Sequence, residues 1–187
     1  MNVFAEFVGG MTGTDPILYD GTPQIAFIGR SNVGKSSVIN ALVNRKDLVK
    51  VSATPGRTAQ INCFKTNTGV YLVDLPGYGY AKVGGAEREK LKKMILWYLI
   101  DSQVKPLVVL ILDVKAGCTE FDEQTLEVLR EQKHAYLIVA NKVDKLNQKE
   151  LSEQLRAIRQ ISHEAEIIEC STLTNGGIRA LSERLFG

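Results

Sequence analysis

A loop bounded by two glycines and ending in Gly-Lys-Ser has residue types and spacing that can do chemistry. Successive backbone N–H groups in such a loop can converge on an anion, and the positive end of the following helix adds to the attraction. The lysine can reach the outer phosphates, and the serine hydroxyl can bind magnesium. By itself the pattern fits ATP and GTP equally. The residues concerned are Gly29, Arg30, Ser31, Asn32, Val33, Gly34, Lys35, Ser36 and Ser37.

A second motif, Asp-x-x-Gly, follows the apolar run at 70–73. Its carboxylate suits the outer shell of a magnesium ion, and its glycine N–H can face a terminal phosphate with no side chain in between. Asp-x-x-Gly alone is a common turn, so its meaning depends on the other motifs. The residues expected to contact nucleotide here are Asp74, Leu75, Pro76 and Gly77.

A third motif, Asn-Lys-x-Asp, separates GTP from ATP. Guanine offers two adjacent donors that an ionised Asp144 can accept in a fork, whereas adenine has no such pair. The alternative is that Asp144 only caps the helix that follows. The loop after the next predicted strand would meet the guanine carbonyl oxygen through its backbone N–H groups. The residues of these two loops are Asn141, Lys142, Val143, Asp144, Cys170, Ser171 and Thr172.

The elements that must position these loops alternate between strands and helices. Continuous apolar runs at 107–113 and 135–140 indicate strands buried on both faces, as in a parallel sheet covered by helices. We therefore expect an α/β fold of three layers, with a mixed, mostly parallel sheet. Ligands of such sheets bind at the carboxyl ends of the strands, where the three motifs stand. The predicted strands are 25–28, 61–65, 70–74, 107–113, 135–140 and 166–170, and the predicted helices are 37–43, 86–99, 120–132, 149–161 and 177–186.

Composition limits the possible classes of protein. The chain has 187 residues, 44% of them hydrophobic and 24% charged, with a net charge of +2, which predicts one ordinary globular domain. We expect residues 1–22 to be an N-terminal extension, in which 3–8 can add an edge strand, and 23–187 to be the domain. No run approaches the roughly 20 apolar residues of a membrane span. Three widely spaced cysteines predict buried thiols in a reducing compartment.

Taken together, residues 29–37, 55–58, 74–81 and 141–144 resemble the EngB family of bacterial GTPases, also called YihA or YsxC, within the TrmE-Era-EngA-EngB-septin-like GTPases. The resemblance covers the chain from about Phe7. It implies a P-loop GTPase with a Ras-like G domain that is cytoplasmic and hydrolyses GTP to GDP and phosphate. It also implies a role in large ribosomal subunit assembly and a link to septation and cell division.

The family pattern implies a magnesium site of three protein ligands, Ser36, Thr58 and Asp74. Thr58 would meet the metal only when the γ-phosphate is present, as in other order–disorder switches. Thr54 remains a rival for this role. The segment expected to contact nucleotide here consists of Gly56, Arg57, Thr58, Ala59 and Gln60.

Tyr78 stands where many small GTPases carry the glutamine that orients the attacking water, so slow intrinsic hydrolysis is expected. Asn32 resembles the asparagine that helps to bind potassium in related GTPases, which makes K⁺ a candidate cofactor. The alternative is an amide that only stabilises the loop. Arg57 is either a built-in arginine finger, a solvated switch residue or a contact to RNA phosphate. The residues given a catalytic role are Asn32, Thr58 and Gly77.

The expected partners are GTP, GDP and the large ribosomal subunit or its precursor, and the chain is expected to be a monomer. A basic segment of Arg88, Lys90, Lys92 and Lys93 either touches ribosomal RNA or is a solvated helix face. A competing function is a nucleotide-sensing module with negligible turnover that recruits division or envelope proteins. An ATPase or kinase is disfavoured by Asp144.

Overall fold

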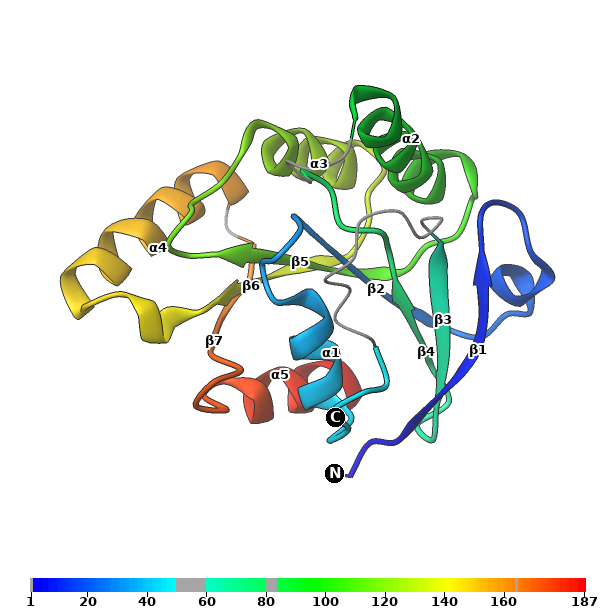
Figure 1. Cartoon of the computed structure of the whole chain (residues 1–187), viewed down its shortest axis with the longest axis horizontal. Coiled ribbons are helices and arrows are strands. Elements are labelled where there is room, and N and C mark those ends of the chain that lie inside the picture. The colour runs from blue at the N-terminus through cyan, green and yellow to red at the C-terminus, as the bar shows by residue number, and fades with distance from the viewer. Residues whose placement is uncertain (1, 50–59, 80–83, 164) are drawn as a thin grey trace.

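In the computed structural model, which describes residues 2–49, 60–79, 84–163 and 165–187, seven strands form one sheet between layers of helices (Figure 1). Their order across the sheet is β1-β3-β4-β2-β5-β6-β7. The fold class expected from the sequence is confirmed. The strands are β1 (Ala5–Met11), β2 (Gln24–Gly29), β3 (Ile61–Thr66), β4 (Tyr71–Asp74), β5 (Leu107–Asp113), β6 (Tyr136–Asn141) and β7 (Ile167–Cys170).

The sheet is mixed and mostly parallel. The strands β4, β2, β5, β6 and β7 run parallel to one another, whereas β3 pairs antiparallel with both β1 and β4. The strands β3 and β4 form a hairpin, as predicted, and the turn between them contains Gly69 at φ 82°. The five parallel strands therefore end at one edge of the sheet.

Helices cover both faces of the sheet (Figure 1). One face carries α1 (Lys35–Leu42) and α5 (Ile178–Phe186), and the other carries α2 (Gly85–Leu96), α3 (Glu120–Glu131) and α4 (Gln148–Ser162). Short helical turns η1 (Pro16–Tyr19) and η3 (Val143–Lys145) and a π-helical turn η2 (Trp97–Asp101) complete the described part. No helix in these ranges is both long enough and apolar enough to cross a bilayer.

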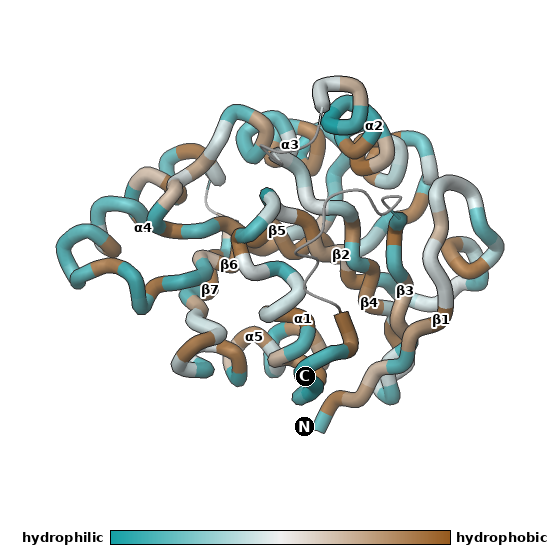
Figure 2. The backbone as a smooth tube through the Cα atoms, in the orientation of Figure 1, coloured by the Kyte–Doolittle hydropathy of each residue, from teal (hydrophilic) through white to brown (hydrophobic). Residues whose placement is uncertain are grey.

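The two large apolar cores lie on the two faces of the sheet, because successive strand side chains point in opposite directions. On β2, Phe27 packs in the core under α1 and α5, while Ile28 packs in the core under α2 and α3. Figure 2 shows mostly hydrophobic residues along the central strands and many hydrophilic residues along α4. Burial of both faces explains why the central strands have continuous apolar sequences.

The N-terminal segment forms the sheet edge next to β3. Ala5 pairs with Thr66 and Met11 with Ile61, and the register shifts between Phe7 and Gly9. The sequence suggested an edge strand in this region, and the structure places it at β1. The shift and the two glycines explain why the alternation of the sequence is weak here.

Candidate nucleotide site

Three of the predicted motifs meet at the carboxyl edge of the parallel strands. The phosphate loop follows β2, the Asp-x-x-Gly motif begins at the last residue of β4, and the Asn-Lys-x-Asp motif begins at the last residue of β6. The loop of Ser171 follows β7 at the same edge. Because β4, β2, β5, β6 and β7 are neighbours, the topology brings together these four segments, which are far apart in the sequence.

Close packing requires glycine at both ends of the phosphate loop. A Cβ on Gly29 would lie 2.7 Å from the Ile111 carbonyl oxygen, and one on Gly34 would meet the Asn141 amide. Gly34 also has φ 97° and caps α1 without any side-chain hydrogen bond. The first N–H groups of α1 are therefore not used by a side-chain cap at this position, as a phosphate-binding helix end requires.

Lys35 and Asp74 form a buried ion pair between the start of α1 and the end of β4. The two residues are 9% and 6% exposed, so each charge needs a partner of opposite sign. The Asp74 carboxylate is thus held where a cation is favoured, next to the turn that carries Ser36. This arrangement fits a magnesium ion completed by phosphate oxygens, since Mg²⁺ uses few protein ligands at such sites.

Asn141 and Lys142 connect the Asn-Lys-x-Asp loop, residues 141–144 and called the base loop below, to the phosphate loop. The Asn141 side-chain N–H donates to the Val33 carbonyl at 2.7 Å, and the Lys142 ammonium donates to the Asn32 carbonyl at 2.6 Å. The Lys142 ammonium also lies 2.8 Å from an Asp113 carboxylate oxygen. The Asn141 oxygen is buried and has no partner among the described residues. These contacts make the two loops one unit.

Asp144 is oriented by the loop after β7. The Ser171 hydroxyl donates to its carboxylate at 2.5 Å, and this hydrogen bond holds the pKa of Asp144 below its usual range. The carboxylate is therefore ionised at neutral pH and can accept a pair of donors. The alternative that Asp144 caps the next helix is wrong, because Asn147 is the N-cap of α4 and forms a capping box with Glu150.

Tyr78 points into the protein and not toward the phosphate loop. It is 2% exposed, its hydroxyl donates to Asp122, and its ring lies edge-on to Phe121 with centroids 4.5 Å apart. Burial raises the pKa of Tyr78, so the hydroxyl stays protonated. Its main-chain carbonyl accepts a hydrogen bond from the Ser31 N–H at 2.7 Å.

Sequence reasoning missed two carboxylates near the site. Asp113 ends β5 at the same edge as the motifs, so its position at a strand terminus was a usable signal. Asp122 belongs to the capping box of α3 with Thr119, and nothing in the sequence pairs it with Tyr78.

Some predicted residues lie outside the described part: Gly56, Arg57, Thr58, Ala59 and the rival Thr54. Gln60 and Asn32 are described and exposed. The Asn32 main-chain carbonyl accepts the Lys142 ammonium, and the role of the Asn32 side chain stays a prediction. Of the basic residues on α2, Arg88, Lys90 and Lys93 are exposed, and Lys92 lies over the Phe121 ring, 4.9 Å from its centroid.

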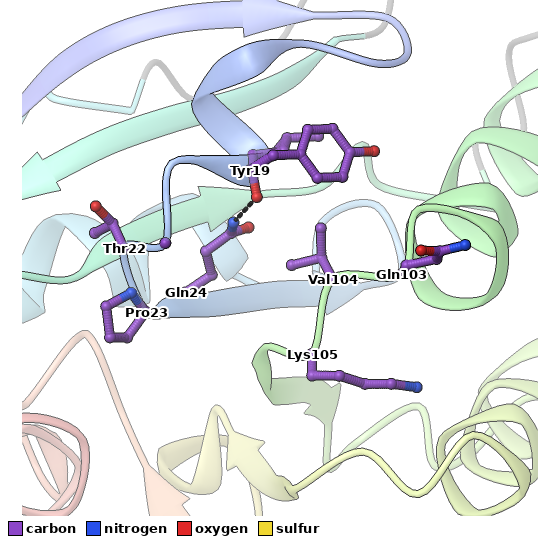
Figure 3. Close-up of a pocket in the computed structure, with 9 residues that line it drawn as sticks. Tyr19, Thr22, Pro23, Gln24, Gln103, Val104 and Lys105 are labelled. Carbon is purple, nitrogen blue, oxygen red and sulfur yellow. Dashed lines mark hydrogen bonds between the residues drawn. The ribbon is translucent and has the colours of Figure 1, made fainter.

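A separate concavity lies at the amino ends of β2 and β5, away from the motifs (Figure 3). Gln24 lies at its base, and the Gln24 amide donates to the Leu18 carbonyl and accepts from the Tyr98 hydroxyl. The polar side-chain atoms of Gln24 are therefore already paired within the protein. The carboxyl edge is the candidate site.

The fold and the joined loops define the class of protein: a P-loop GTPase. A sequence model of a family described as a 50S ribosome-binding GTPase matches residues 24–142. The chain belongs to the EngB family of GTP-binding proteins, as its relatives show. It is 42% identical over 182 residues to the probable GTP-binding protein EngB of Chlorobaculum parvum, covering 97% of this chain and 95% of that one.

Two further similarities agree with this family. The probable GTP-binding protein EngB of Solibacter usitatus is 45% identical over 177 residues, which cover 95% of this chain and 92% of the relative. A crystal structure of a probable GTP-binding protein engB has a TM-score of 0.76 at 25% identity, covering 87% of this chain and 96% of that chain.

Proposed function

We propose that the chain binds GTP and GDP with magnesium, hydrolyses GTP to GDP and phosphate, and acts as a switch in large ribosomal subunit assembly, with a link to cell division. The observation that carries GTP over ATP is the Asp144 carboxylate, which Ser171 orients at the end of a loop joined to the phosphate loop. A carboxylate at this place satisfies the two donors of guanine and finds no such donors on adenine.

Each part of the site takes one piece of the nucleotide. The phosphate loop, residues 29–37, holds the phosphates. When nucleotide binds, the Lys35 ammonium leaves its ion pair with Asp74 and binds the outer phosphates. Ser36, Asp74 and Thr58 hold magnesium, which neutralises charge that develops on the phosphates. Gly77 offers its N–H to the γ-phosphate, and Lys142 lies along the base.

Intrinsic turnover is slow in this proposal, because Tyr78 is turned away from the phosphate loop and supplies no water-orienting amide. Asn32, helped by potassium, and Arg57 are the groups that replace it. The same observation favours the second candidate, a nucleotide-sensing module with negligible turnover that recruits division or envelope proteins.

The partner follows from the family description, which names the 50S ribosome. The exposed Arg88, Lys90 and Lys93 of α2 offer positive charge to ribosomal RNA phosphates. We further propose a cytoplasmic monomer made of one GTP-binding domain, residues 23–187, with residues 1–22 as its extension.

Binding and co-sedimentation test the proposal. Titration with fluorescent GTP, GDP and ATP should give saturable binding of both guanine nucleotides and none of ATP, with GTP turnover measured by phosphate release. Large ribosomal subunits should sediment with the chain in a non-hydrolysable GTP analogue and release it in GDP. Subunit-stimulated turnover supports the switch, and binding without any stimulation supports the second candidate. Equal affinity for ATP and GTP would refute the guanine assignment.

A further inference from the structure

A continuous set of contacts joins the phosphate loop to α3 through Tyr78. On the main-chain side, the Tyr78 carbonyl accepts the Ser31 N–H, and Arg30 and Tyr78 form a short parallel bridge. On the side-chain side, the Tyr78 hydroxyl donates to Asp122. Tyr78 therefore contacts the phosphate loop with its backbone and α3 with its side chain.

The acceptor on α3 is itself fixed. Asp122 is 2% exposed, and its second carboxylate oxygen accepts from the Thr119 N–H at 2.8 Å and from the Thr119 hydroxyl at 2.6 Å. It stands in the first turn of α3, where the helix dipole favours negative charge. The Tyr78 hydroxyl thus donates to a buried and rigid carboxylate, which is a strong type of hydrogen bond.

The Tyr78 ring is enclosed as well. Phe121 packs on it in an edge-to-face arrangement at 64°, and Lys92 of α2 lies over the Phe121 ring. At 2% exposure the Tyr78 side chain is almost fully enclosed by the protein. Tyr78 is accordingly held more firmly than a residue of a free loop would be.

The residue before Tyr78 takes its position from this anchor. A Cβ on Gly77 would lie 3.4 Å from the Ser31 Cα and N atoms, so the Gly77 backbone passes directly beside the phosphate loop. Gly79, at φ 72°, packs on Arg30, and its Cβ would lie 2.8 Å from Arg30 Cγ. Residues 77–79 therefore pack closely against the phosphate loop, and the Tyr78 side chain anchors them to α3.

We propose that Tyr78 is a positioning residue for the γ-phosphate: its hydrogen bond to Asp122 holds the Gly77 backbone against the phosphate loop. This inference rests on the proposed GTP binding and extends it. It predicts an effect confined to GTP, because the β-phosphate and the guanine base of GDP are held by other segments. A ligand that lacks the third phosphate gains nothing from Gly77.

The test compares two tyrosine-to-phenylalanine variants. Tyr78→Phe removes only the hydroxyl that donates to Asp122. Tyr98→Phe is its matched control, since Tyr98 is also buried and its hydroxyl donates to Gln24 at 2.7 Å, at the far end of the sheet. For Tyr78→Phe we expect the ratio of GTP to GDP affinity and the single-turnover hydrolysis rate each to fall about five- to tenfold, with GDP affinity unchanged. Tyr98→Phe should keep the ratio and the rate of the wild type.

A double-mutant cycle connects the effect to α3. If the hydrogen bond is the cause, Asp122→Ala should lower the same ratio, and the double variant should be no worse than the more affected single variant. An unchanged GTP to GDP affinity ratio in Tyr78→Phe, while the wild type binds both nucleotides, would overturn the positioning role and leave the proposed function standing. A wild-type chain that binds no guanine nucleotide would instead refute both.

Discussion

The Asp113 carboxylate and the Lys142 ammonium lie 2.8 Å apart, and this pair holds the lysine of the base loop in place. The same ammonium donates to the Asn32 carbonyl of the phosphate loop. Lys142 is thus fixed between the end of β5 and the phosphate loop. A ligand that needs both loops meets a site that is already organised, which reduces the ordering cost of binding.

Replacing Asp113 should therefore weaken nucleotide binding without removing any group that touches the nucleotide. In Asp113→Ala, Lys142 loses its partner, and we expect GTP and GDP affinity to fall together by about fivefold, or roughly 1 kcal/mol. Glu166→Ala is a matched control because it breaks an ion pair of similar length, to Arg184 at 2.7 Å, away from the carboxyl edge. Titration with fluorescent nucleotides measures these affinities. Equal affinities in the wild type and Asp113→Ala would contradict the role of Asp113 in positioning Lys142.

Asp144→Asn should change the base that the site prefers. The amide replaces one acceptor with a donor, so we expect GTP affinity to fall about 100-fold and xanthosine triphosphate to bind better than GTP. Asp20→Asn serves as the control. The Asp20 carboxylate also accepts a hydrogen bond from a hydroxyl, that of Tyr71 at 2.7 Å, and the pKa of Asp20 is also lowered. Competition titrations with both nucleotides would refute the assignment if the variant still preferred GTP.

Potassium should accelerate hydrolysis through Asn32. Asn32 has φ 68°, so Asn32→Gly removes the amide without backbone strain. We expect wild-type turnover to be at least about fivefold faster in potassium than in sodium, and the variant to lose this difference. Asn44→Gly, also at positive φ but at the end of α1, should keep it. Equal rates in both salts for the wild type would exclude cation assistance.

The three thiols should resist alkylation in the folded chain. Burial raises the pKa of Cys63 and Cys118 to about 12 and that of Cys170 to about 11. At pH 8 only about one Cys63 thiol in ten thousand is then ionised, and the thiolate is the form that reacts. Raised pKa values also mean that thiol burial favours the folded state below about pH 9, an effect lost as the pH rises toward 12.

Iodoacetamide labelling followed by peptide mass spectrometry checks this expectation. We expect each cysteine to react at least about 100-fold more slowly than free glutathione at pH 8, and all three to react at ordinary rates in denaturant. Cys63 and Cys170 are buried and Cys118 is half-buried, so labelling of Cys63 or Cys170 in the folded chain at nearly the glutathione rate would contradict this expectation.

Much of this fold follows from local sequence patterns. The continuous apolar run of β5 requires burial on both faces, and the motifs at the ends of β2, β4 and β6 are recognisable because glycine, lysine and carboxylates follow apolar strands. The edge strand β1 was harder to predict, because its glycines and register shift weaken the alternation.

The pairings that organise the site could not be predicted in the same way. Tyr78 with Asp122 and Lys142 with Asp113 are contacts between residues distant in the sequence, and each depends on how neighbouring strands and helices pack. The residue types alone allow many partners. Only the packing of α3 against the segment that follows β4, and the pairing of β5 with β6, selects these contacts.

The position of β1 has a consequence for the order in which the chain can acquire its structure during synthesis. Its partner residues on β3 run from Ile61 to Thr66, so the pairing of β1 cannot be completed until residue 66 has emerged. The central strand β2 has no neighbour until β4 has emerged, and its second neighbour, β5, comes later still. The growing chain therefore carries strands without partners until their later neighbours have been translated.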